Sequence, residues 1–455
     1  MKRFLLVSIL ISYALLGKTG PDFDDYFINK TMRIDYYFTG IKNECRISLD
    51  KIIEEPHWAG SMNNLIDTLN FGNHLVEVYD NESDTLIFSK GFSSLFQEWQ
   101  TTDEAAQGFY RTFSASVLIP YPKKSIKLFH YSRNNKNEFI REFETVIDPA
   151  SRLIKRDKPQ SDYKLKACLK NGSPNKKVDI LILPEGYTKK EMRKFRKDVR
   201  HFADVLFKAP PFKEYKDRFN VWFLEVPSEE SGIDDPRKSV FVKSAFELSY
   251  NSFDSDRYIL AFDNKRIRDI AANAPYDQLY FLINSNKYGG GGIYNLYSTC
   301  YSHSDKEENS WWPDYVFVHE FGHAFGGLAD EYYTSDVAYN DFYPVNAEPW
   351  EPNVTPNTDK TTLKWKQFIE PEIPVPTPWE KDLFNNIPYK NSEDRKSLLR
   401  KQEYWGKVGA YEGSGYSSEG LYRPFLDCRM FSKSLVEFCP VCQESIVRVI
   451  KFHSE

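Results

Sequence analysis

The chain has 455 residues, of which 41% are hydrophobic and 16% aromatic, and its formal net charge at pH 7 is −5. This length allows two or three domains, and the large apolar fraction excludes a disordered chain. Charges of both signs are interspersed without a basic stripe or an acidic tail, so the sequence argues against a nucleic-acid partner.

Residues 1–20 have the pattern of a secretory signal peptide. Lys2 and Arg3 give a positive start, and the apolar run FLLVSILISYALLG follows at residues 4–17. The run is too short to span a bilayer comfortably, and no later stretch reaches its length, so the sequence predicts no transmembrane segment. A buried first strand or helix is the alternative interpretation. We predict that the mature protein is exported to the periplasm, the cell surface or the medium.

Residues 21–150 predict a β-sandwich. Segments such as HLVEVYD and KSIKLFHYS alternate apolar and polar residues, and Gly, Asn, Asp and Pro separate them. Aromatic residues in such strands fit either a binding role toward carbohydrate or protein, or a purely structural role. Prolines and mixed charges then interrupt the alternation, and we place a linker at residues 151–170.

Residues 171–455 predict an α/β domain with a mixed sheet. The segment KKVDILILPEGY at residues 176–187 is a continuous apolar run, as expected of a strand that is covered on both faces. It leads into a helix that Thr188 and Glu191 can cap. Further apolar strands alternate with helical segments after it, which is typical of a layered α/β domain.

The stretch VFVHEFGHAFGGLADEYY, residues 316–333, predicts a helix with a metal site. His319 and His323 are four residues apart and stand on one face of a helix, where two nitrogens can bind one Zn²⁺ at about 2.0–2.1 Å. Glu320 can accept a proton from a zinc-activated water, as in metallopeptidases of the H-E-x-x-H type. The alternative is an ordinary buried helix whose two histidines are hydrogen-bonded within the core.

A third ligand is expected shortly after this helix, because a catalytic zinc has three protein ligands and keeps one position open. In metzincin-type sites a glycine ends the helix, and the third ligand follows three residues later. Counting from Gly327 gives Asp330, with Glu331 as the second choice. The sequence thus predicts one catalytic Zn²⁺, bound by His319, His323 and Asp330 in a zincin-like domain.

Four segments of the chain resemble the IgA peptidase family of secreted zinc metallo-endopeptidases: DILILPEGYT, FKAPPFKEYKDRFNVW, HEFGHAFGGLADEY and YSSEGLYRPFLDCRMF. The segment GFSSLFQEWQTTDEA looks like the all-β domain that precedes the peptidase domain in gut-bacterial members. The resemblance implies His319 and His323 as zinc ligands and Glu320 as the catalytic base. It leaves the substrate open, because the family is named after a member that cleaves immunoglobulin A.

Three further groups of residues are candidates for supporting roles. Met430 suits the methionine turn that metzincin-like enzymes keep beneath the metal, with core filling as the alternative. Gly291 and Gly292 suit a strand edge that pairs with an extended peptide substrate, with a flexible loop as the alternative. Candidates for the donor that stabilises the oxyanion are Tyr416, Tyr422 and Arg423.

Six cysteines fit an exported protein without defining a disulfide framework. Cys428, Cys439 and Cys442 cluster near the end of the sequence, where an oxidising compartment favours a bridge whose pairing the sequence does not fix. The C-x-x-C of Cys439 and Cys442 could also indicate redox chemistry or a second metal. We favour structural cysteines, because the motif is isolated and no thioredoxin-like βαβ pattern surrounds it.

The sequence therefore predicts a secreted zinc-dependent endopeptidase acting on protein substrates, with immunoglobulin A or other host mucosal proteins as candidates. One other function is a surface-binding or adhesion protein with a structural zinc. The intact Glu320 argues against it, because a structural site needs no base. Another is a zinc amidase or deacetylase that acts on glycans, and a peptide-length cleft would argue against that function.

Overall fold

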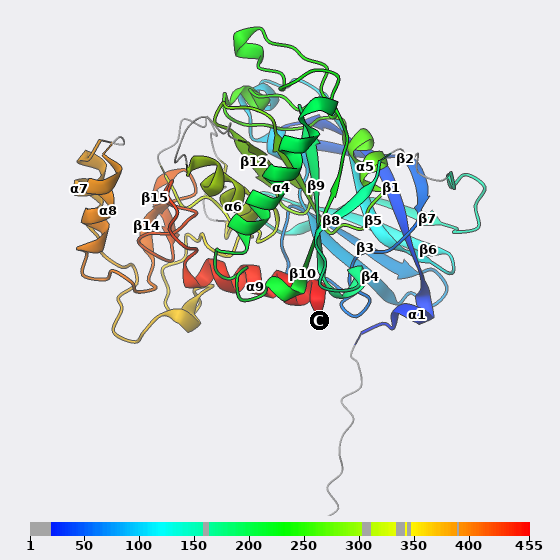
Figure 1. Cartoon of the computed structure of the whole chain (residues 1–455). Coiled ribbons are helices and arrows are strands. Elements are labelled where there is room, and N and C mark those ends of the chain that lie inside the picture. The colour runs from blue at the N-terminus through cyan, green and yellow to red at the C-terminus, as the bar shows by residue number, and fades with distance from the viewer. Residues whose placement is uncertain (1–19, 158–162, 303–310, 334–341, 344–346, 389–390) are drawn as a thin grey trace, which may run out of the picture.

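The structure, a computed structural model, describes residues 20–157, 163–302, 311–333, 342–343, 347–388 and 391–455 (Figure 1). The predicted signal peptide lies outside the described residues, apart from residue 20. Within the described ranges, no helix has both the length and the apolar character needed to cross a membrane. An N-terminal part made mainly of strands precedes a part in which helices cover a sheet.

Two antiparallel sheets make up the N-terminal part. The first has the strand order β2-β1-β5, and the second has the order β4-β3-β6-β7. The strand bounds are β1 Phe27–Ile41, β2 Glu44–Glu55, β3 His74–Asp80, β4 Leu86–Phe92, β5 Arg111–Pro122, β6 Ile126–Arg133 and β7 Phe139–Ile147. Short helices accompany these strands: α1 Phe23–Tyr26, α2 Leu95–Gln100 and α3 Asp103–Ala106.

The two N-terminal sheets pack through facing side chains. In β3 every second residue is buried, as the two-residue period of a strand predicts. The Phe38 ring of β1 stacks on the His74 ring of β3 at a centroid separation of 4.8 Å, and Tyr36 meets His130 of β6 at 5.6 Å. Residues of both sheets therefore belong to one buried apolar cluster.

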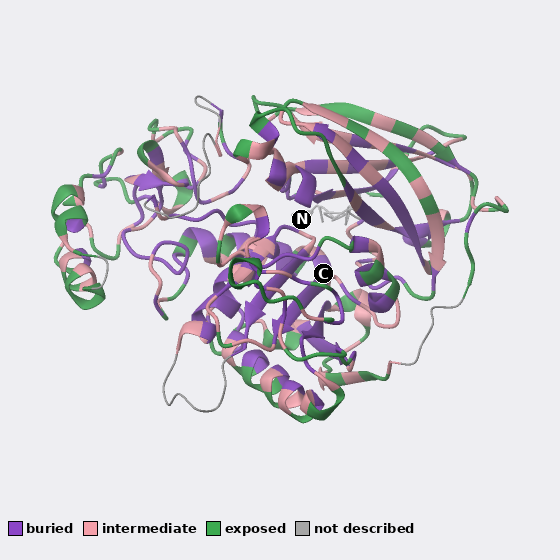
Figure 2. Ribbon diagram, turned by 90° about the horizontal axis from the view of Figure 1, so that it is seen from above, coloured by how far each residue is buried: buried purple, intermediate pink, exposed green. Residues whose placement is uncertain are grey.

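A six-stranded sheet forms the centre of the molecule, in the order β12-β13-β11-β9-β10-β8. Its inner strands are parallel, and the edge strands β12 and β8 run antiparallel to their neighbours. The central β9, β10 and β11 are buried along their whole length, as their apolar runs predict (Figure 2). The bounds are β8 Leu165–Leu169, β9 Val178–Glu185, β10 Phe219–Leu224, β11 Gln278–Ile283, β12 Gly290–Ile293 and β13 Tyr297–Tyr301.

Helices alternate with these strands and follow them. Thr188 and Glu191 form the predicted capping box, at a 3-10 turn that leads directly into α4. The helices are α4 Met192–Leu206, α5 Asn264–Ala271, α6 Trp312–Ala324, α7 Lys381–Asn386, α8 Ser392–Arg400 and α9 Pro440–Ser454. A separate hairpin is formed by β14 Tyr411–Ser414 and β15 Ser417–Arg423. The 3-10 turns are η1 Pro174–Lys176, η2 Lys189–Glu191, η3 Lys216–Arg218, η4 Pro236–Lys238, η5 Ser252–Asp254 and η6 Lys366–Phe368.

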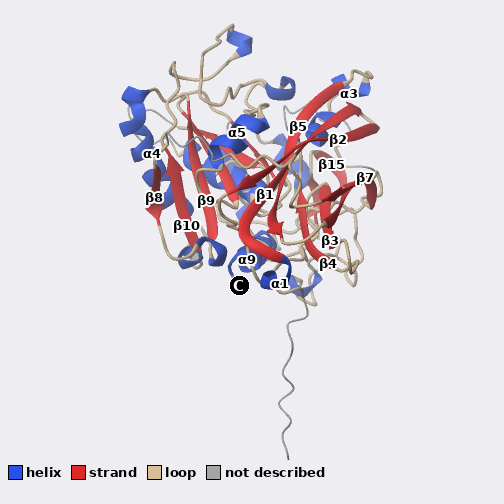
Figure 3. Ribbon diagram, turned by 90° about the vertical axis from the view of Figure 1, so that its right-hand side faces the viewer, coloured by secondary structure: helices blue, strands red, loops and turns tan. Residues whose placement is uncertain are grey.

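The two faces of the central sheet are covered differently, as the side-chain alternation in β9 shows. Ile180 and Ile182 belong to a buried cluster with residues of α4, α6 and α9, which lie on one face (Figure 1). Leu181 and Leu183 point the opposite way, into the cluster that contains α5 and the two N-terminal sheets. Figure 3 shows α5 between the central sheet and β1. The N-terminal part thus acts as the outer layer of the second face.

The boundary between the two parts differs from the predicted linker at residues 151–170. Residues 165–169 form β8, which pairs with β10, and Ile154 is buried in the shared cluster. The strand was missed because it lies at a sheet edge and most of its residues are at least partly exposed, so it has no apolar run. The two parts therefore share a core.

Candidate metal centre

Helix α6 carries the three residues of the predicted H-E-x-x-H motif. Pro313 occupies its first turn and Asp314 lies near its positive end, and both residues are favourable there. After the helix, Gly327 adopts a positive φ of 64°, and the Leu328 N–H donates to the Gly322 carbonyl oxygen at 3.2 Å. This turn directs the following acidic residues back toward the helix.

Three side-chain atoms meet beside α6. The Nε2 atoms of His319 and His323 are 3.2 Å apart. Asp330 Oδ1 lies 3.2 Å from the first of these nitrogens and 3.3 Å from the second. His319 and Asp330 are buried and His323 is partly buried. The structure thus brings the three predicted ligands together in a triangle of nearly equal sides.

Backbone carbonyl groups hold the other ring nitrogen of each histidine. His319 Nδ1 donates to the Arg429 carbonyl oxygen at 3.1 Å, and His323 Nδ1 donates to the Leu328 carbonyl oxygen at 2.6 Å. Because a carbonyl oxygen can only accept, a neutral imidazole in either position carries its proton on Nδ1 and presents a lone pair at Nε2. Two lone pairs and a carboxylate oxygen that face one another need a proton or a cation between them.

The triangle fits a zinc ion. Tetrahedral zinc with ligands at about 2.0–2.1 Å places neighbouring ligand atoms about 3.3 Å apart, and the observed separations are 3.2, 3.2 and 3.3 Å. Asp330 Oδ1 is buried and has no hydrogen-bond partner among the described residues, as expected of a metal ligand. Three protein ligands leave one tetrahedral position free, which is the arrangement of catalytic zinc sites.

The electrostatics of the triangle agree with this fit. Burial opposes the ionisation of Asp330, but His323 and His319 outweigh burial and hold the pKa of Asp330 well below its usual value. Burial lowers the pKa of His323, whereas Asp330 and Glu320 raise it, and the pKa becomes about 9. Without a cation, the triangle therefore holds a carboxylate and a proton on His323 at neutral pH, and a metal cation bound there takes the place of that proton.

Glu320 shares a cavity of about 150 Å³ with the triangle. Burial raises the pKa of the Glu320 carboxyl group, although both neighbouring histidines lower it. A carboxyl group with a raised pKa takes up and releases a proton more readily at neutral pH, which suits a general base. The rest of the cavity lining includes Asn73, Ser93, Glu98, Arg257, Tyr258, Tyr288, Gly290, Gly292, Tyr332, Trp350, Glu351, Tyr416 and Lys433.

Edge strand β12 lies directly against α6 because its glycines lack side chains. A Cβ atom at Gly292 would lie 2.3 Å from the Glu320 carbonyl oxygen, and a Cβ atom at Gly290 would lie 2.7 Å from Val316 Cγ1. Both distances are too short for any other residue at these positions. The glycine run therefore allows the sheet edge to border the cavity.

The outer edge of β12 is only partly covered. The Gly290 N–H donates to the Arg257 carbonyl oxygen, and the Gly290 carbonyl oxygen accepts from the Ile259 N–H, each at 3.2 Å. Since peptide groups alternate along a strand, those of Gly292 also face outward, whereas those of Gly291 face β13. Of the two glycines predicted for substrate pairing, Gly292 is the one that lines the cavity.

Met430, the residue predicted for a methionine turn, packs against α6. Its side chain is fully buried. A Cβ atom at Gly322 would lie 3.2 Å from Met430 Sδ, so the thioether contacts the helix between the two histidines. The Glu331 N–H donates to the Met430 carbonyl oxygen at 2.8 Å, which ties this segment to the residue after Asp330.

The predicted oxyanion donors have other surroundings. Tyr416 lines the cavity, but its hydroxyl donates to Asp330 Oδ2. Arg423 is fully buried and donates to the Gly413 carbonyl oxygen at 2.7 Å. Neither Arg423 nor Tyr422 lines the cavity, so their assignment as oxyanion donors is wrong. Their proximity to the methionine in sequence was misleading, because the β14–β15 hairpin holds both side chains away from the triangle.

Glu331, the second choice for the third ligand, does not face the triangle. Its carboxylate lies among the thiols of Cys428, Cys439 and Cys442, with all ligand atoms within 4.8 Å of one another. All six cysteines of the chain are described, and all six are free thiols. The bridge predicted within the cysteine cluster is therefore absent from the structure.

Arg257 belongs to the site and was missed from the sequence. It lines the cavity. Burial lowers the pKa of Arg257, but Tyr332, Tyr288, Asp330 and Glu320 outweigh burial and raise it. Arg257 lies in an irregular segment before α5, far from the motif, and a single arginine among 60 basic residues carries no signal of its own.

A larger cavity of about 630 Å³ lies away from the metal centre, between the N-terminal part and the central sheet. Its lining includes Trp58, Phe88, Tyr276 and Phe452. It contains neither Glu320 nor any corner of the triangle. Neither of the two groups of potential metal ligands found among the described residues lines this cavity.

Comparisons with known proteins assign both parts of the chain. The family described as "IgA Peptidase M64" matches residues 167–398 and 385–450, and the family described as "Peptidase M64 N-terminus" matches residues 22–144. No curated protein matches significantly. Among solved structures, "Crystal Structure of a Thermostable Esterase" is 9% identical, and the match covers 56% of this chain and 67% of the other. Its TM-score of 0.15 is too low to carry a structural argument.

Proposed function

The chain belongs to the IgA peptidase M64 family, and from that premise we propose that it is an exported, zinc-dependent endopeptidase. The family match covers more than half of the chain and confirms the resemblance predicted from the sequence. The observation that supports zinc dependence most directly is the triangle of two Nε2 atoms and Asp330 Oδ1 beside Glu320.

In this proposal His319, His323 and Asp330 hold one Zn²⁺, and the bonds from Nδ1 to backbone carbonyls fix the orientation of each imidazole. A bound zinc ion supplies Lewis acidity, which polarises a peptide carbonyl group and acidifies a water molecule. Glu320 accepts a proton from the attacking water and then donates it to the amine that leaves. The raised pKa of Glu320 favours both transfers near neutral pH.

Two further residues of the cavity are proposed to hold the substrate. The Arg257 guanidinium lines the same cavity as Glu320, and its permanent charge can stabilise the negative oxygen of the tetrahedral intermediate. The outward peptide groups of Gly292 can pair with the backbone of an extended substrate. Pairing of this kind favours a peptide substrate over a glycan.

We propose secreted host proteins, including immunoglobulin A or other mucosal proteins, as the substrate class. The family assignment and the predicted signal peptide support this class. Asn73, Ser93 and Glu98 of the N-terminal part line the catalytic cavity. We therefore propose that this part contributes to substrate recognition as well as to stability.

Substitutions that remove either the proposed base or a proposed zinc ligand test the proposed function, because the two should affect zinc content differently. We expect Glu320→Ala to retain the zinc content of the wild type, because Glu320 does not bind the ion, and to lose about 10²-fold or more in turnover. His323→Ala should lose one equivalent of zinc relative to the wild type and all activity. Zinc is measured by mass spectrometry after dialysis, and activity is measured on a panel of secreted proteins.

Glu393→Ala is a matched control, because Glu393 is an exposed carboxylate on α8 that does not line the cavity. It should behave as the wild type in both assays. Cleavage by Glu320→Ala at the wild-type rate would contradict the proposed base. A wild-type protein that binds zinc and cleaves nothing in the panel would favour the adhesion function over the endopeptidase.

A further inference from the structure

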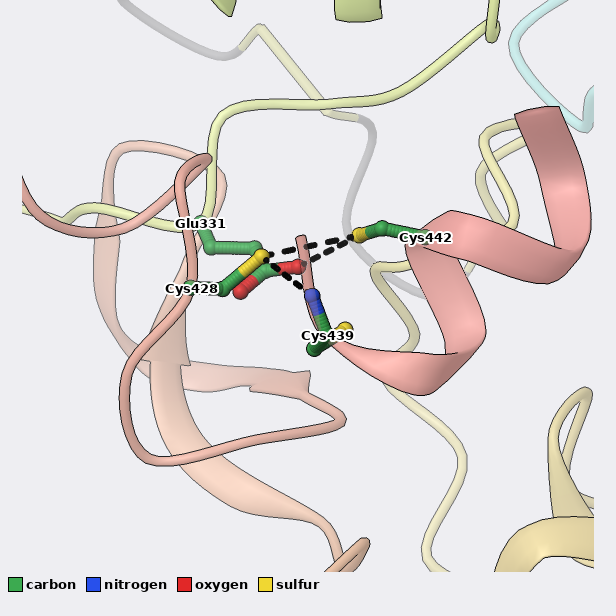
Figure 4. A group of neighbouring side chains, drawn as sticks. All are labelled: Glu331, Cys428, Cys439 and Cys442. Atoms are coloured by element: carbon green, nitrogen blue, oxygen red, sulfur yellow. Dashed lines mark hydrogen bonds between the residues drawn. The ribbon is translucent and has the colours of Figure 1, made fainter. Parts of the chain in front are cut away.

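Glu331, Cys428, Cys439 and Cys442 form a compact cluster next to the candidate metal centre (Figure 4). Glu331 directly follows Asp330, Cys428 lies after β15, and the other two cysteines stand at the start of α9. Each of the four residues is at most 3% exposed. The cluster therefore places three thiols and a carboxylate in an environment without water access.

The separations within the cluster fit tetrahedral coordination. Cys428 Sγ and Cys442 Sγ are 3.8 Å apart, and Cys442 Sγ lies 3.2 Å from Glu331 Oε1. Zinc bonds of about 2.3 Å to sulfur and about 2.0 Å to oxygen place two sulfurs about 3.8 Å apart and a sulfur and an oxygen about 3.5 Å apart. A disulfide instead needs about 2.05 Å between sulfurs, and it would leave one of the three thiols over.

The carboxylate of Glu331 provides an independent observation. Its Oε1 accepts from Asn353 Nδ2 at 3.0 Å, whereas Oε2 has no hydrogen-bond partner among the described residues. A fully buried carboxylate oxygen without a donor is costly. Arg423 acts on Glu331 only through its charge, since its guanidinium donates to the carbonyl oxygens of Gly413 and Phe425. A hydrogen-bonded ion pair therefore does not explain the buried carboxylate.

We propose that Glu331, Cys428, Cys439 and Cys442 bind a second zinc ion. Four protein ligands complete the tetrahedron, so this site is closed and structural, unlike the centre on α6. Three soft thiolate ligands favour zinc over magnesium or calcium. The C-x-x-C spacing at a helix start is typical of structural zinc sites, and the Cys439 N–H donates to Cys428 Sγ at 3.2 Å, which stabilises a thiolate.

The second ion connects the two chain segments that support the catalytic centre. One ligand, Glu331, is adjacent to Asp330. Another, Cys428, is adjacent to Arg429, whose carbonyl oxygen accepts from His319 Nδ1. The second site thereby fixes the position of Asp330 relative to the Arg429 carbonyl oxygen, which orients His319. Its role is to position these groups.

Zinc counting and X-ray absorption spectroscopy on the full-length protein test this proposal. We expect two equivalents of zinc in the wild type and one in His323→Ala. The zinc in His323→Ala should show three sulfur neighbours at about 2.3 Å and one oxygen neighbour. Absence of sulfur-bound zinc in His323→Ala would overturn the proposal, and so would a disulfide among the three cysteines in the unreduced protein. Because His323→Ala removes the catalytic ion, this result is separate from the proposed proteolysis.

Two substitutions identify the ligands. Cys442→Ser should lose one equivalent of zinc and lower the melting temperature, whereas Cys168→Ser, a partly buried cysteine outside the cluster, should change neither. Glu331→Gln preserves the size of the side chain and should weaken zinc binding at this site at least about tenfold in competition with a chelator. A Cys442→Ser protein that folds and keeps two equivalents of zinc would contradict the assignment.

Discussion

At the residue scale, the carboxylate of Asp330 uses its two oxygens differently. Oδ2 accepts a hydrogen bond from the Tyr416 hydroxyl, and Oδ1 faces the two imidazoles. Tyr416→Phe removes the bond that orients the carboxylate but leaves the three proposed ligands in place. We expect zinc affinity at this site to fall about 10–100-fold, with near wild-type turnover when zinc is in excess. Chelator competition and activity titrations with zinc measure the two effects.

Tyr422→Phe serves as the matched control for this substitution, because Tyr422 lies in the same hairpin but does not line the cavity. It should leave zinc affinity unchanged. If Tyr416→Phe also binds zinc as tightly as the wild type, the hydrogen bond to Asp330 does not contribute to metal binding.

The buried imidazole of His130 makes the N-terminal part sensitive to acid. Neither ring nitrogen has a hydrogen-bond partner among the described residues, and burial lowers the pKa of His130 to about 3. In the unfolded chain this pKa is about 6.5. Below pH 6.5 the unfolded chain therefore takes up a proton that the folded chain does not bind. This proton uptake stabilises the unfolded chain, so the free energy of unfolding is highest above pH 6.5 and falls progressively as the pH drops toward 3.

We expect His130→Phe to remove this part of the pH dependence, because Phe keeps a ring beside Phe38 and cannot take up a proton. Between pH 7.5 and 4.5 the free energy of unfolding should fall about 2–3 kcal/mol more in the wild type than in the variant. Urea unfolding at a series of pH values measures the difference. His57→Gln, at an exposed histidine, should follow the wild type. Parallel curves for His130→Phe and the wild type would refute the expectation.

At the scale of elements, the contact between β12 and α6 sets the wall of the cavity. A methyl group at Gly292 would meet the Glu320 carbonyl oxygen at 2.3 Å, so either β12 or α6, which carries the proposed base, must shift to make room. We expect Gly292→Ala to lower kcat/KM at least about tenfold by displacing β12, α6 or both. The melting temperature should fall only moderately, since β12 is an edge strand.

Gly172→Ala is the matched control, because a Cβ atom there meets only the flexible Lys177 side chain. Steady-state kinetics and thermal unfolding should therefore match the wild type. Wild-type kinetics in Gly292→Ala would show that the edge of β12 neither borders the reacting groups nor pairs with the substrate.

Elements with strong local signals could be predicted from the sequence. The apolar run at β9 and the i, i+4 histidines on α6 each depend on neighbours within a few residues. The edge strand β8 could not be predicted, because its mixed residues gain their conformation from pairing with β10. Counting from a glycine placed Asp330 beside the histidines, but no local pattern indicates that Glu331 meets Cys442, which is 111 residues away in sequence.

At the scale of the whole molecule, the shared core predicts that the peptidase part does not fold alone. The cluster that contains Leu181 and Leu183 of β9 also contains residues of both N-terminal sheets. Arg33 of β1, only 2% exposed, donates to Asp269 of α5 at 2.6 Å. Loss of the N-terminal part would expose this apolar face, which costs about 25 cal/mol for each Å² of apolar surface. At that rate about 300 Å² of newly exposed surface costs about 7 kcal/mol, which is comparable to the whole stability of a typical domain, about 5–15 kcal/mol.

We therefore expect a fragment of residues 163–455 to be insoluble, or to melt without a cooperative transition. The full chain should melt cooperatively under the same conditions. Circular dichroism during heating and size-exclusion chromatography compare the two proteins. A soluble fragment with cooperative melting would show that the two parts have separate cores.

The groups that complete the centre on α6 come from far along the chain. The Arg429 carbonyl oxygen that orients His319 comes 110 residues after that histidine in the sequence. The Tyr416 hydroxyl that donates to Asp330 comes 86 residues after that aspartate. A polypeptide that has emerged from the ribosome only as far as α6 contains the H-E-x-x-H motif but lacks these partners. If the centre on α6 is the hydrolytic site that we propose, a chain whose last segments have not yet been synthesised therefore carries the motif without activity.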